Sequence, residues 1–401
     1  PTSTMKEIFK TSFRLPLLLI SILVTHSCTK NIEPLIVVKP HSSIVLIGNN
    51  LGSRMLNFGT FETEMQLRYP TDSLVIRNMC DGGDTPGFRP HSGRVSPWAF
   101  PGAEKFQTEL AQNSGSEGVF ETPDEWLSRL QADIILGFFG YNESFEGPQG
   151  LENYKEELDA FIKHSLKQKY NGTTPPQLII VSPIAFEDLS DHIDIPNGET
   201  ANQNLKLYSE AMKEVCLANN IPFINAFQAS KNWYDTDNNG LTIDGSQLNK
   251  EGYEKFAQFL ADALSGNKSI KSKDKRLAVN EAIKEKNFYW HNDYKIPNGV
   301  HVFGRRHAPY GPDNYPYEIK KTRELTAIRD SMIWATVQNQ SYNVASADGL
   351  TSKLPPVETN YNLGNKESIL QYKYGNEALK TLTVPKGYEV SLFASEKEFP
   401  D

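Results

Sequence analysis

Residues 43–51 read SIVLIGNNL, a short apolar run that ends in glycine and leads directly into a helical pattern. An apolar run of this length, bounded by turn residues, is typical of a buried β-strand. Strands that alternate with helices form a parallel sheet covered on both faces, so the sequence predicts an α/β fold. The expected strands are 43–48, 73–78, 132–140, 177–183 and 221–227, and the expected helices are 51–68, 124–131, 151–169, 201–219 and 249–264.

Glycine and polar residues follow the ends of these strands. The sequence reads GNNL at 48–51, NMCDGGDTP at 78–86, GYNES at 140–144 and DGSQLNK at 244–250. A parallel sheet carries its chemistry at the carboxyl ends of its strands, so we expect these segments to meet along one edge. The segment 84–123 is rich in Gly, Pro and Ser and is expected to be a loop or lid at the same edge.

Composition excludes several classes of protein. The chain has 401 residues, 38% of them apolar, which is enough for a folded body and argues against disorder. Basic residues number 41 against 49 acidic ones, a formal charge of -8, and no long Lys/Arg run is present. A nucleic-acid partner is therefore not expected.

The first 27 residues are expected to be a signal peptide. Lys6, Lys10 and Arg14 precede an apolar stretch at 15–24 that is too short to span a bilayer. The stretch leads through Thr-His-Ser into Cys28 and resembles a bacterial lipoprotein signal, which implies an acylated Cys28 and an exported protein of the cell envelope, in the periplasm or on the cell surface. Membrane association is then expected only through the lipid. Cleavage at a nearby site, or an uncleaved anchor, remains as an alternative.

The two remaining cysteines, Cys80 and Cys216, are expected to be small buried side chains, because two cysteines do not make a disulfide framework.

The chain after residue 265 differs in composition. Residues 266–276 are Lys/Ser-rich and are expected to be a connector. Residues 277–340 are expected to be a helical and aromatic-rich extension, with helices at 278–287 and 319–337, that packs on the first domain. Residues 341–401 are expected to be a linker and the start of a downstream domain. The aromatic side chains of the extension could stack on sugars, but the favoured interpretation is packing; they are Phe288, Tyr289, Trp290, Tyr294, Tyr310, Tyr315 and Tyr317.

The four strand-end blocks match, in order and spacing, those of the SGNH (GDSL-type) esterase and lipase family, over about residues 40–265. The resemblance implies one domain at 35–265 with a flavodoxin-like three-layer fold around a parallel five-stranded sheet, followed by an irregular C-terminal extension. It also implies a catalytic Ser at position 50 and a His at position 247, where this chain has Asn50 and Gln247. Asp244, which would orient the His, is present.

The resemblance implies a hydrolase site without its reactive atoms. An amide nitrogen is a poor nucleophile and Gln cannot accept a proton near neutral pH, so Asn50 and Gln247 cannot transfer an acyl group by the triad route. Gly83 and Asn142 occupy the positions of the oxyanion-hole donors. Residues expected to contact a ligand besides these are Gly48, Asn49, Asp84 and Glu143. No cofactor and no metal is expected.

Two other residues could substitute for the missing nucleophile or base. Ser53 lies one helical turn beyond Asn50, and His91 could fold over the site as a base. His164 and His192 are expected to be solvated. The segment 235–240 resembles half of a calcium loop, but position 246 is Ser where a calcium loop has Glu, so a turn is favoured.

These observations leave three functions open. The first is a non-catalytic or very weak module that binds a carbohydrate or an acyl ester. The second is an active esterase on acylated carbohydrate with a non-standard nucleophile. The third is a structural module, because the chain also resembles the N-terminal region of large exported bacterial proteins that continue into a sugar-dehydrogenase-like propeller and a haem c domain. That resemblance implies downstream domains of the same polypeptide as partners.

Overall fold

The computed structural model describes residues 34–108, 118–236, 240–266, 268–296, 299–356 and 373–395. The expected signal peptide and Cys28 lie outside these ranges. Within them, no helix is both long enough and apolar enough to cross a membrane.

The core of the protein is a five-stranded parallel sheet in the order β2-β1-β3-β4-β5. Its strands are β1 (Ser43–Gly48), β2 (Val75–Asn78), β3 (Ile134–Phe138), β4 (Gln177–Val181) and β5 (Phe223–Ile224). This order is that of flavodoxin-like proteins: all strands run parallel, and the order in which they are added to the sheet reverses between β1 and β3. The predicted α/β fold with a parallel five-stranded sheet is confirmed.

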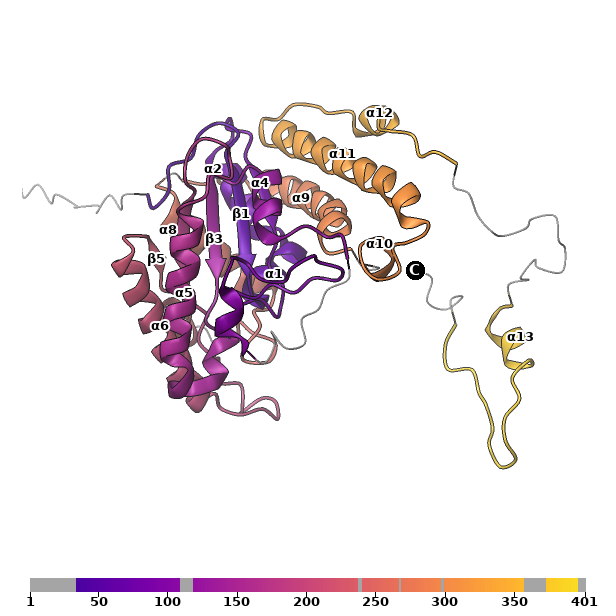
Figure 1. The fold of residues 1–401 in the computed structure, drawn as a ribbon, viewed down its shortest axis with the longest axis horizontal. Coiled ribbons are helices and arrows are strands. Elements are labelled where there is room, and N and C mark those ends of the chain that lie inside the picture. The colour runs from indigo at the N-terminus through magenta and orange to yellow at the C-terminus, as the bar shows by residue number, and fades with distance from the viewer. Residues whose placement is uncertain are drawn as a thin grey trace, which may run out of the picture.

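Helices cover both faces of the sheet (Figure 1). Ile44 and Leu46 of β1 point into one core with α1 (Asn50–Phe58), α2 (Thr60–Arg68) and α8 (Lys250–Leu264). Val45 and Ile47 point into the other, with α4 (Pro123–Arg129), α5 (Leu151–Ser165) and α6 (Glu199–Ala218). This alternation is the two-residue period of a strand buried on both sides.

Short helices complete the domain. They are η1 (Ala103–Phe106), η2 (Glu143–Gly150) and α7 (Ala226–Tyr234). One helix was expected over 51–68, but the structure has two. Gly59 separates α1 from α2 with a φ of 65°, a left-handed conformation that glycine adopts without strain and that ends a helix.

The insertion at 84–123 is a packed loop where it is described. Arg89, Arg94, Phe100 and Phe120 are buried within it, and Phe120 belongs to the core on the α5 side of the sheet. These buried side chains fix the loop to the body, so the described part of the insertion is not built as a lid.

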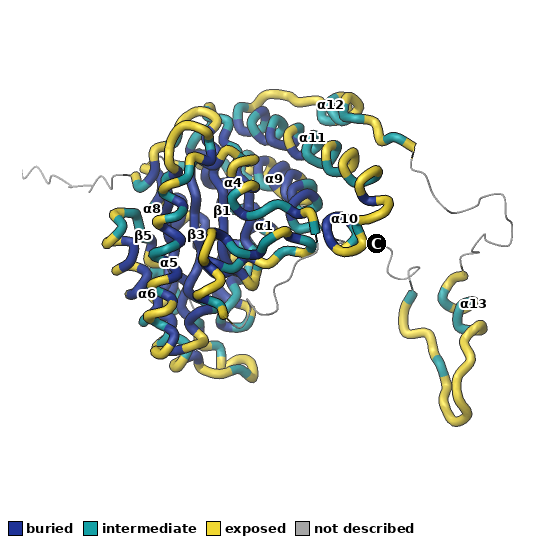
Figure 2. Tube along the Cα trace, viewed as in Figure 1, coloured by how far each residue is buried: buried dark blue, intermediate teal, exposed yellow. Residues whose placement is uncertain are grey.

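The extension after residue 265 is more regular than the sequence indicated. Its two long helices, α9 (Lys273–Tyr294) and α11 (Gly311–Val337), pack against each other and extend beyond both predicted ranges. Leu67 of α2, Ile283 of α9 and Ile333 of α11 share an apolar cluster, which joins the extension to the domain as expected. A short helix, α10 (Gly299–Val302), lies between them, and two more, α12 (Val344–Gly349) and α13 (Gly375–Leu379), follow α11. Figure 2 shows the chain around α13 as largely exposed.

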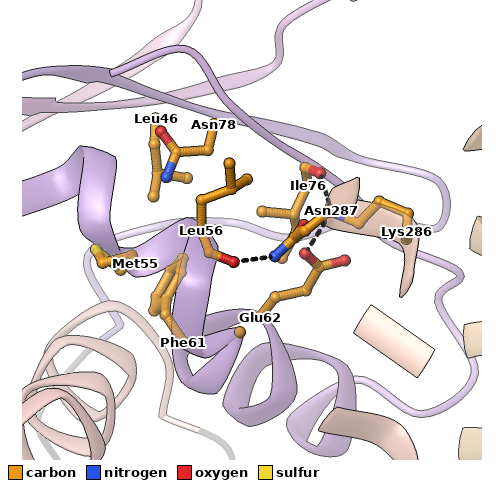
Figure 3. A pocket seen from close by; sticks show the side chains of 10 residues that line it. Leu46, Met55, Leu56, Phe61, Glu62, Ile76, Asn78, Lys286 and Asn287 are labelled. Atoms are coloured by element: carbon orange, nitrogen blue, oxygen red, sulfur yellow. Dashed lines mark hydrogen bonds and ion pairs between the residues drawn. The ribbon is translucent and has the colours of Figure 1, made fainter. Parts of the chain in front are cut away.

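Buried ion pairs also hold the extension to the domain. Lys286 of α9 donates to Glu62 of α2 at 2.7 Å, and Arg77 of β2 forms a two-point ion pair with Asp330 of α11. The Glu62–Lys286 pair borders a cavity of about 20 Å³, beside the Asn287 side chain, which donates to the Leu56 carbonyl (Figure 3). Burial outweighs the mutual attraction of the pair, because the pKa of Glu62 is raised and that of Lys286 is lowered.

Candidate functional site

The turn that follows β1 places the first candidate residues at the sheet edge. Gly48 has a φ of 114°, and a Cβ there would lie 2.0 Å from the Phe138 carbonyl oxygen, so no other residue fits. Asn49 is buried and caps α1, since its Oδ1 accepts from the Leu51 N–H at 3.2 Å. Asn50 is therefore held as the first residue of α1.

Three separated positions meet here in one hydrogen-bond chain. Asn50 Nδ2 donates to Gln247 Oε1 at 3.3 Å, and Gln247 Nε2 donates to Asp244 Oδ2 at 2.7 Å. Burial opposes the charge of Asp244, but hydrogen bonds from Ser246 and Gln247 outweigh it and lower the pKa of this carboxyl. Asp244 is thus an ionised acceptor that fixes the orientation of the Gln247 amide.

The hydrogen bonds from Asn50 through Gln247 to Asp244 follow the order of a Ser-His-Asp relay, but these groups cannot pass a proton along it. In such a relay the first residue gives its proton to the second, and the carboxylate stabilises the resulting cation. An amide nitrogen keeps its proton near neutral pH, and an amide oxygen does not take one up. The arrangement can therefore hold and orient polar groups, whereas it supplies no nucleophile.

Asn50 and Gln247 line a cleft of about 120 Å³ at the carboxyl edge of the sheet. Its other walls include Arg54 of α1, Tyr141 after β3 and Ile184 after β4. The residues come from the ends of different strands, as expected for a site on a parallel sheet.

The expected oxyanion donors are arranged differently. Asn142 Nδ2 donates to the carbonyl oxygens of Gly82 at 3.1 Å and Asp84 at 3.2 Å, which uses both of its hydrogens. Gly83 is exposed in the same turn, and its N–H donates to no described residue. The structure therefore brings Asn142 and the Gly83 turn together, but it directs the Asn142 amide to the backbone of that turn and away from a ligand.

Asp84 and Glu143, which were expected to contact a ligand, are buried and do not line this cleft. Burial raises the pKa of Asp84 well above its usual value, although Arg89 and Arg94 oppose the rise. Glu143 Oε2 accepts from the Gly140 N–H at 2.9 Å. Glu143 thus closes the turn after β3, and we correct its expected role from ligand contact to support of that turn. Asp84 Oδ1 is buried without a hydrogen-bond partner among the described residues, so its expected contact with a ligand stays a prediction.

Glu143 is expected to make the stability of the chain depend on pH. Burial, followed by the charge of Glu157, raises the pKa of Glu143 from 4.5 to about 8. Between these values the folded chain keeps a proton that the unfolded chain releases, so the free energy of unfolding falls as pH rises, by up to about 1.4 kcal/mol per pH unit. Urea denaturation across this window should show a shallower slope for Glu143→Gln than for wild type.

The matched control is Glu156→Gln, because Glu156 is exposed on α5 and is not among the charges that raise the pKa of Glu143. It should leave the slope unchanged. Equal slopes in wild type and Glu143→Gln would contradict a buried, protonated Glu143.

The suggested substitutes do not complete a triad. Ser53 Oγ accepts from Lys295 Nζ at 2.9 Å, and this ammonium also donates to the Cys80 carbonyl. His91 stacks on Phe120, and its Nε2 lies 2.6 Å from the Tyr294 carbonyl oxygen. Burial lowers the pKa of His91 to about 4. The ring is thus a neutral packing group, and its single N–H donates to only one of the two nearby carbonyl oxygens, of Ser92 or of Tyr294.

The other two histidines differ from each other. His164 was expected to be solvated, but its side chain is only 18% exposed and its Nε2 lies 2.8 Å from Asp124. That prediction is wrong because Phe100 of the insertion packs over this face of α5. His192 is exposed, as predicted.

The remaining sequence predictions concern packing and metals. Cys80 and Cys216 are free and buried, as expected. Trp290 and Tyr294 stack in the core, which confirms packing for these two, whereas Phe288, Tyr310 and Tyr317 are exposed. Residues 237–239 of the calcium-like segment lie outside the described residues. Among those described, no group of three or more His, Cys, Asp or Glu could hold a metal ion.

Two positively charged residues were not predicted from the sequence: Arg54, which lines the cleft, and Lys295, which donates to Ser53. Arg54 follows Asn50 by four residues and therefore lies on the same face of α1, so the helical period could have indicated it. Lys295 comes from the end of α9, and no local pattern connects it with Ser53 or Cys80.

Comparison with known proteins gives structural similarity only. No family model and no curated protein matches the chain. A gut microbial diltiazem-metabolizing enzyme is 13% identical over 58% of this chain and 48% of its own, with a TM-score of 0.40. A GDSL-like lipase from Parabacteroides merdae is 13% identical over 58% of this chain and all of its own, with a TM-score of 0.42.

A catalytic mutant of an acetylxylan esterase from Geobacillus stearothermophilus is 10% identical over 59% of this chain and all of its own, with a TM-score of 0.39. The chain is similar to these enzymes in fold. The match spans about half the length of the diltiazem-metabolizing enzyme. At these identities the likeness concerns architecture and says nothing of activity.

Proposed function

We propose that residues 35–265 form a ligand-binding module of SGNH esterase lineage with little or no hydrolytic activity. The observation that carries this proposal is the hydrogen-bond chain from Asn50 through Gln247 to Asp244, which has the order of a catalytic triad without its nucleophile or base. Loss of the working members of a triad costs on the order of a millionfold in turnover.

The chemistry of the cleft favours a carbohydrate or an acyl ester as the ligand. Amide groups donate and accept hydrogen bonds without charge, which suits sugar hydroxyls and ester carbonyls alike. Asn49 and Asn50 begin a helix at the cleft, where the positive end of the helix dipole also favours an electron-rich oxygen. Binding is thus retained in this proposal while acyl transfer is lost.

The test is hydrolysis of p-nitrophenyl acetate by the full chain. We expect a rate no higher than that of a folded control protein without an esterase site, and the same rate in Gln247→Ala. Turnover that saturates with ester concentration and disappears in a folded Gln247→Ala variant would sink the proposal.

A second candidate is an esterase that uses Ser53, and the contact that favours it is the 2.9 Å hydrogen bond from Lys295 Nζ to Ser53 Oγ. A serine–lysine pair can act only if the amine is neutral and takes the serine proton. Here the amine donates to the Ser53 hydroxyl and to the Cys80 carbonyl and lies 3.5 Å from Asp81, so it is placed as a donor to the hydroxyl and not as its base. This candidate therefore ranks second, and loss of ester turnover in Ser53→Ala would favour it.

We further propose that the module is exported and anchored through lipid on Cys28, with downstream domains of the same polypeptide as its neighbours. One diacylglycerol together with an N-acyl chain supplies the two signals that stable anchoring requires. In the natural host, Cys28→Ala should move the protein from the membrane fraction to the soluble fraction or block its processing. A mature N-terminus other than an acylated Cys28, measured by mass spectrometry, would contradict this.

A further inference from the structure

Arg54 places a positive charge in the cleft. It lies on α1 one turn beyond Asn50 and lines the same cleft as Asn50 and Gln247. Its Nε is buried and has no hydrogen-bond partner among the described residues. A buried donor without an acceptor is costly, so this guanidinium is incompletely satisfied in the protein alone.

No carboxylate of the described residues forms an ion pair with Arg54. Arg54 itself is half-buried. The fully buried arginines of the domain are engaged by acceptors: Arg68 pairs with Asp262, Arg77 pairs with Asp330, and Arg89 and Arg94 donate to backbone carbonyls, although the Nε of Arg89 lacks a partner as that of Arg54 does. The side-chain contact of Arg54 is with the phenol of Tyr253, whose hydroxyl donates to the Leu51 carbonyl at 3.0 Å. A phenol does not neutralise a guanidinium.

The carboxylate of Asp244, which ends the hydrogen-bond chain from Asn50 and Gln247, does not pair with the charge of Arg54. Asp244 Oδ1 accepts from the N–H groups of Ser246 and Gln247, and its Oδ2 accepts from the Gln247 amide. Both carboxylate oxygens of Asp244 are therefore engaged by Ser246 and Gln247, and Gln247 stands between Asp244 and Asn50. The cleft therefore combines an unpaired guanidinium and a helix N-terminus with the amides of Asn50 and Gln247, a set that fits an anion carrying hydroxyl groups.

An aromatic surface borders the same cleft. Tyr141 lines it, and Phe145, which is 74% exposed, packs edge-on against Tyr141 with ring centroids 5.4 Å apart. An exposed phenylalanine beside a polar cleft offers an apolar ring face on which the C–H face of a sugar can stack.

We infer that the cleft takes a sugar with a carboxylate group, a uronic acid, whose carboxylate pairs with Arg54 and whose hydroxyls bond to the amides of Asn50 and Gln247. This inference rests on the proposed binding function and specifies its ligand class. Arg54 then determines specificity, because a planar guanidinium binds a carboxylate at two points.

The test compares sugars that differ at one group. Binding of D-glucuronate and D-glucose, and of D-galacturonate and D-galactose, is measured with the full chain by NMR titration at neutral pH and low salt. In at least one pair the uronate should bind at least about tenfold more tightly than the neutral sugar, since a hydrogen bond to a charged group contributes about 1.5–3 kcal/mol. Salt should weaken uronate binding and leave binding of the neutral sugar unchanged.

Arg54→Gln should remove the preference for the uronate, and Arg54→Lys should retain part of it. Both variants are compared with wild type by thermal unfolding, and a preference that is lost in Arg54→Gln but partly kept in an equally stable Arg54→Lys assigns the loss to charge. Equal binding of uronate and neutral sugar by wild type would overturn the inference alone. Binding of none of the four sugars would overturn the carbohydrate proposal as well. Butyrate, a carboxylate without hydroxyl groups, is measured in the same way. If it binds as tightly as glucuronate, the cleft recognises a carboxylate and not a sugar, which would overturn the inference of a uronic acid.

Discussion

The double variant Asn50→Ser, Gln247→His is expected to hydrolyse p-nitrophenyl acetate at least about a hundredfold faster than wild type. The two changes put a hydroxyl and an imidazole at the two ends of an existing hydrogen bond, and Asp244 already accepts from the second position at 2.7 Å. Its lowered pKa keeps it ionised, as an orienting carboxylate must be.

The gain should be far below that of a natural esterase. The Asn142 amide is bonded to the carbonyls of Gly82 and Asp84, so the oxyanion would depend on the Gly83 N–H and the backbone N–H of position 50. Each missing oxyanion donor costs on the order of a hundred- to a thousandfold in turnover. A misplacement of the new imidazole by about 1 Å could cost a further hundredfold.

Each single variant is the control, and each should stay near the wild-type rate because the members of a triad act as a unit. If the double variant folds with the wild-type unfolding midpoint and still shows no turnover on several aryl and sugar acetates, the cleft does not retain the geometry of a hydrolase site. The structural-module function would then be favoured.

Lys286→Met is expected to lower the free energy of unfolding by about 3–5 kcal/mol. The side chain of Lys286 is 1% exposed and that of Glu62 is 7% exposed, so removing the ammonium leaves a buried carboxyl without its charged partner. Glu62 Oε1 already lacks a partner, and the adjoining cavity of about 20 Å³ holds roughly one water, which does not replace an ammonium. Urea denaturation followed by circular dichroism measures the loss.

Two variants make this test specific. Adding Glu62→Leu to Lys286→Met should recover most of the lost stability, because well-packed apolar residues often replace a buried ion pair at no net cost. Lys320→Ala breaks an exposed pair with Glu324 and should change the free energy of unfolding by less than about 1 kcal/mol. A loss below about 1 kcal/mol in Lys286→Met would show that α9 is not held to the domain by this pair.

The sheet could be predicted from the sequence because its signals are local. Runs such as 43–48 and 132–140 are apolar throughout, and a strand buried on both faces leaves that pattern. The contact between Asn50 and Gln247, 197 residues apart, was also within reach, since both positions lie in blocks whose order matches a known family.

Features that depend on long-range packing were not predictable. The Asn142 amide turns toward the Gly82 carbonyl because of how two strand-end loops meet, and no local pattern encodes that meeting. The pairing of Glu62 with Lys286, 224 residues later, joins a helix of the domain to one of the extension, whereas either residue alone looks like an ordinary surface charge. The split at Gly59 was missed because the apolar residues continue on both sides of it.

The most direct test of the central claim is labelling of the full chain with a fluorophosphonate, followed by peptide mass spectrometry. This reagent forms a stable adduct with an activated serine hydroxyl, and the claim is that the cleft holds amides where such a hydroxyl and its base would stand. The account predicts no adduct in the wild-type chain and an adduct at position 50 in Asn50→Ser, Gln247→His. An adduct in the wild-type chain, at Ser53 or at any other serine, that is lost on denaturation before labelling would contradict it.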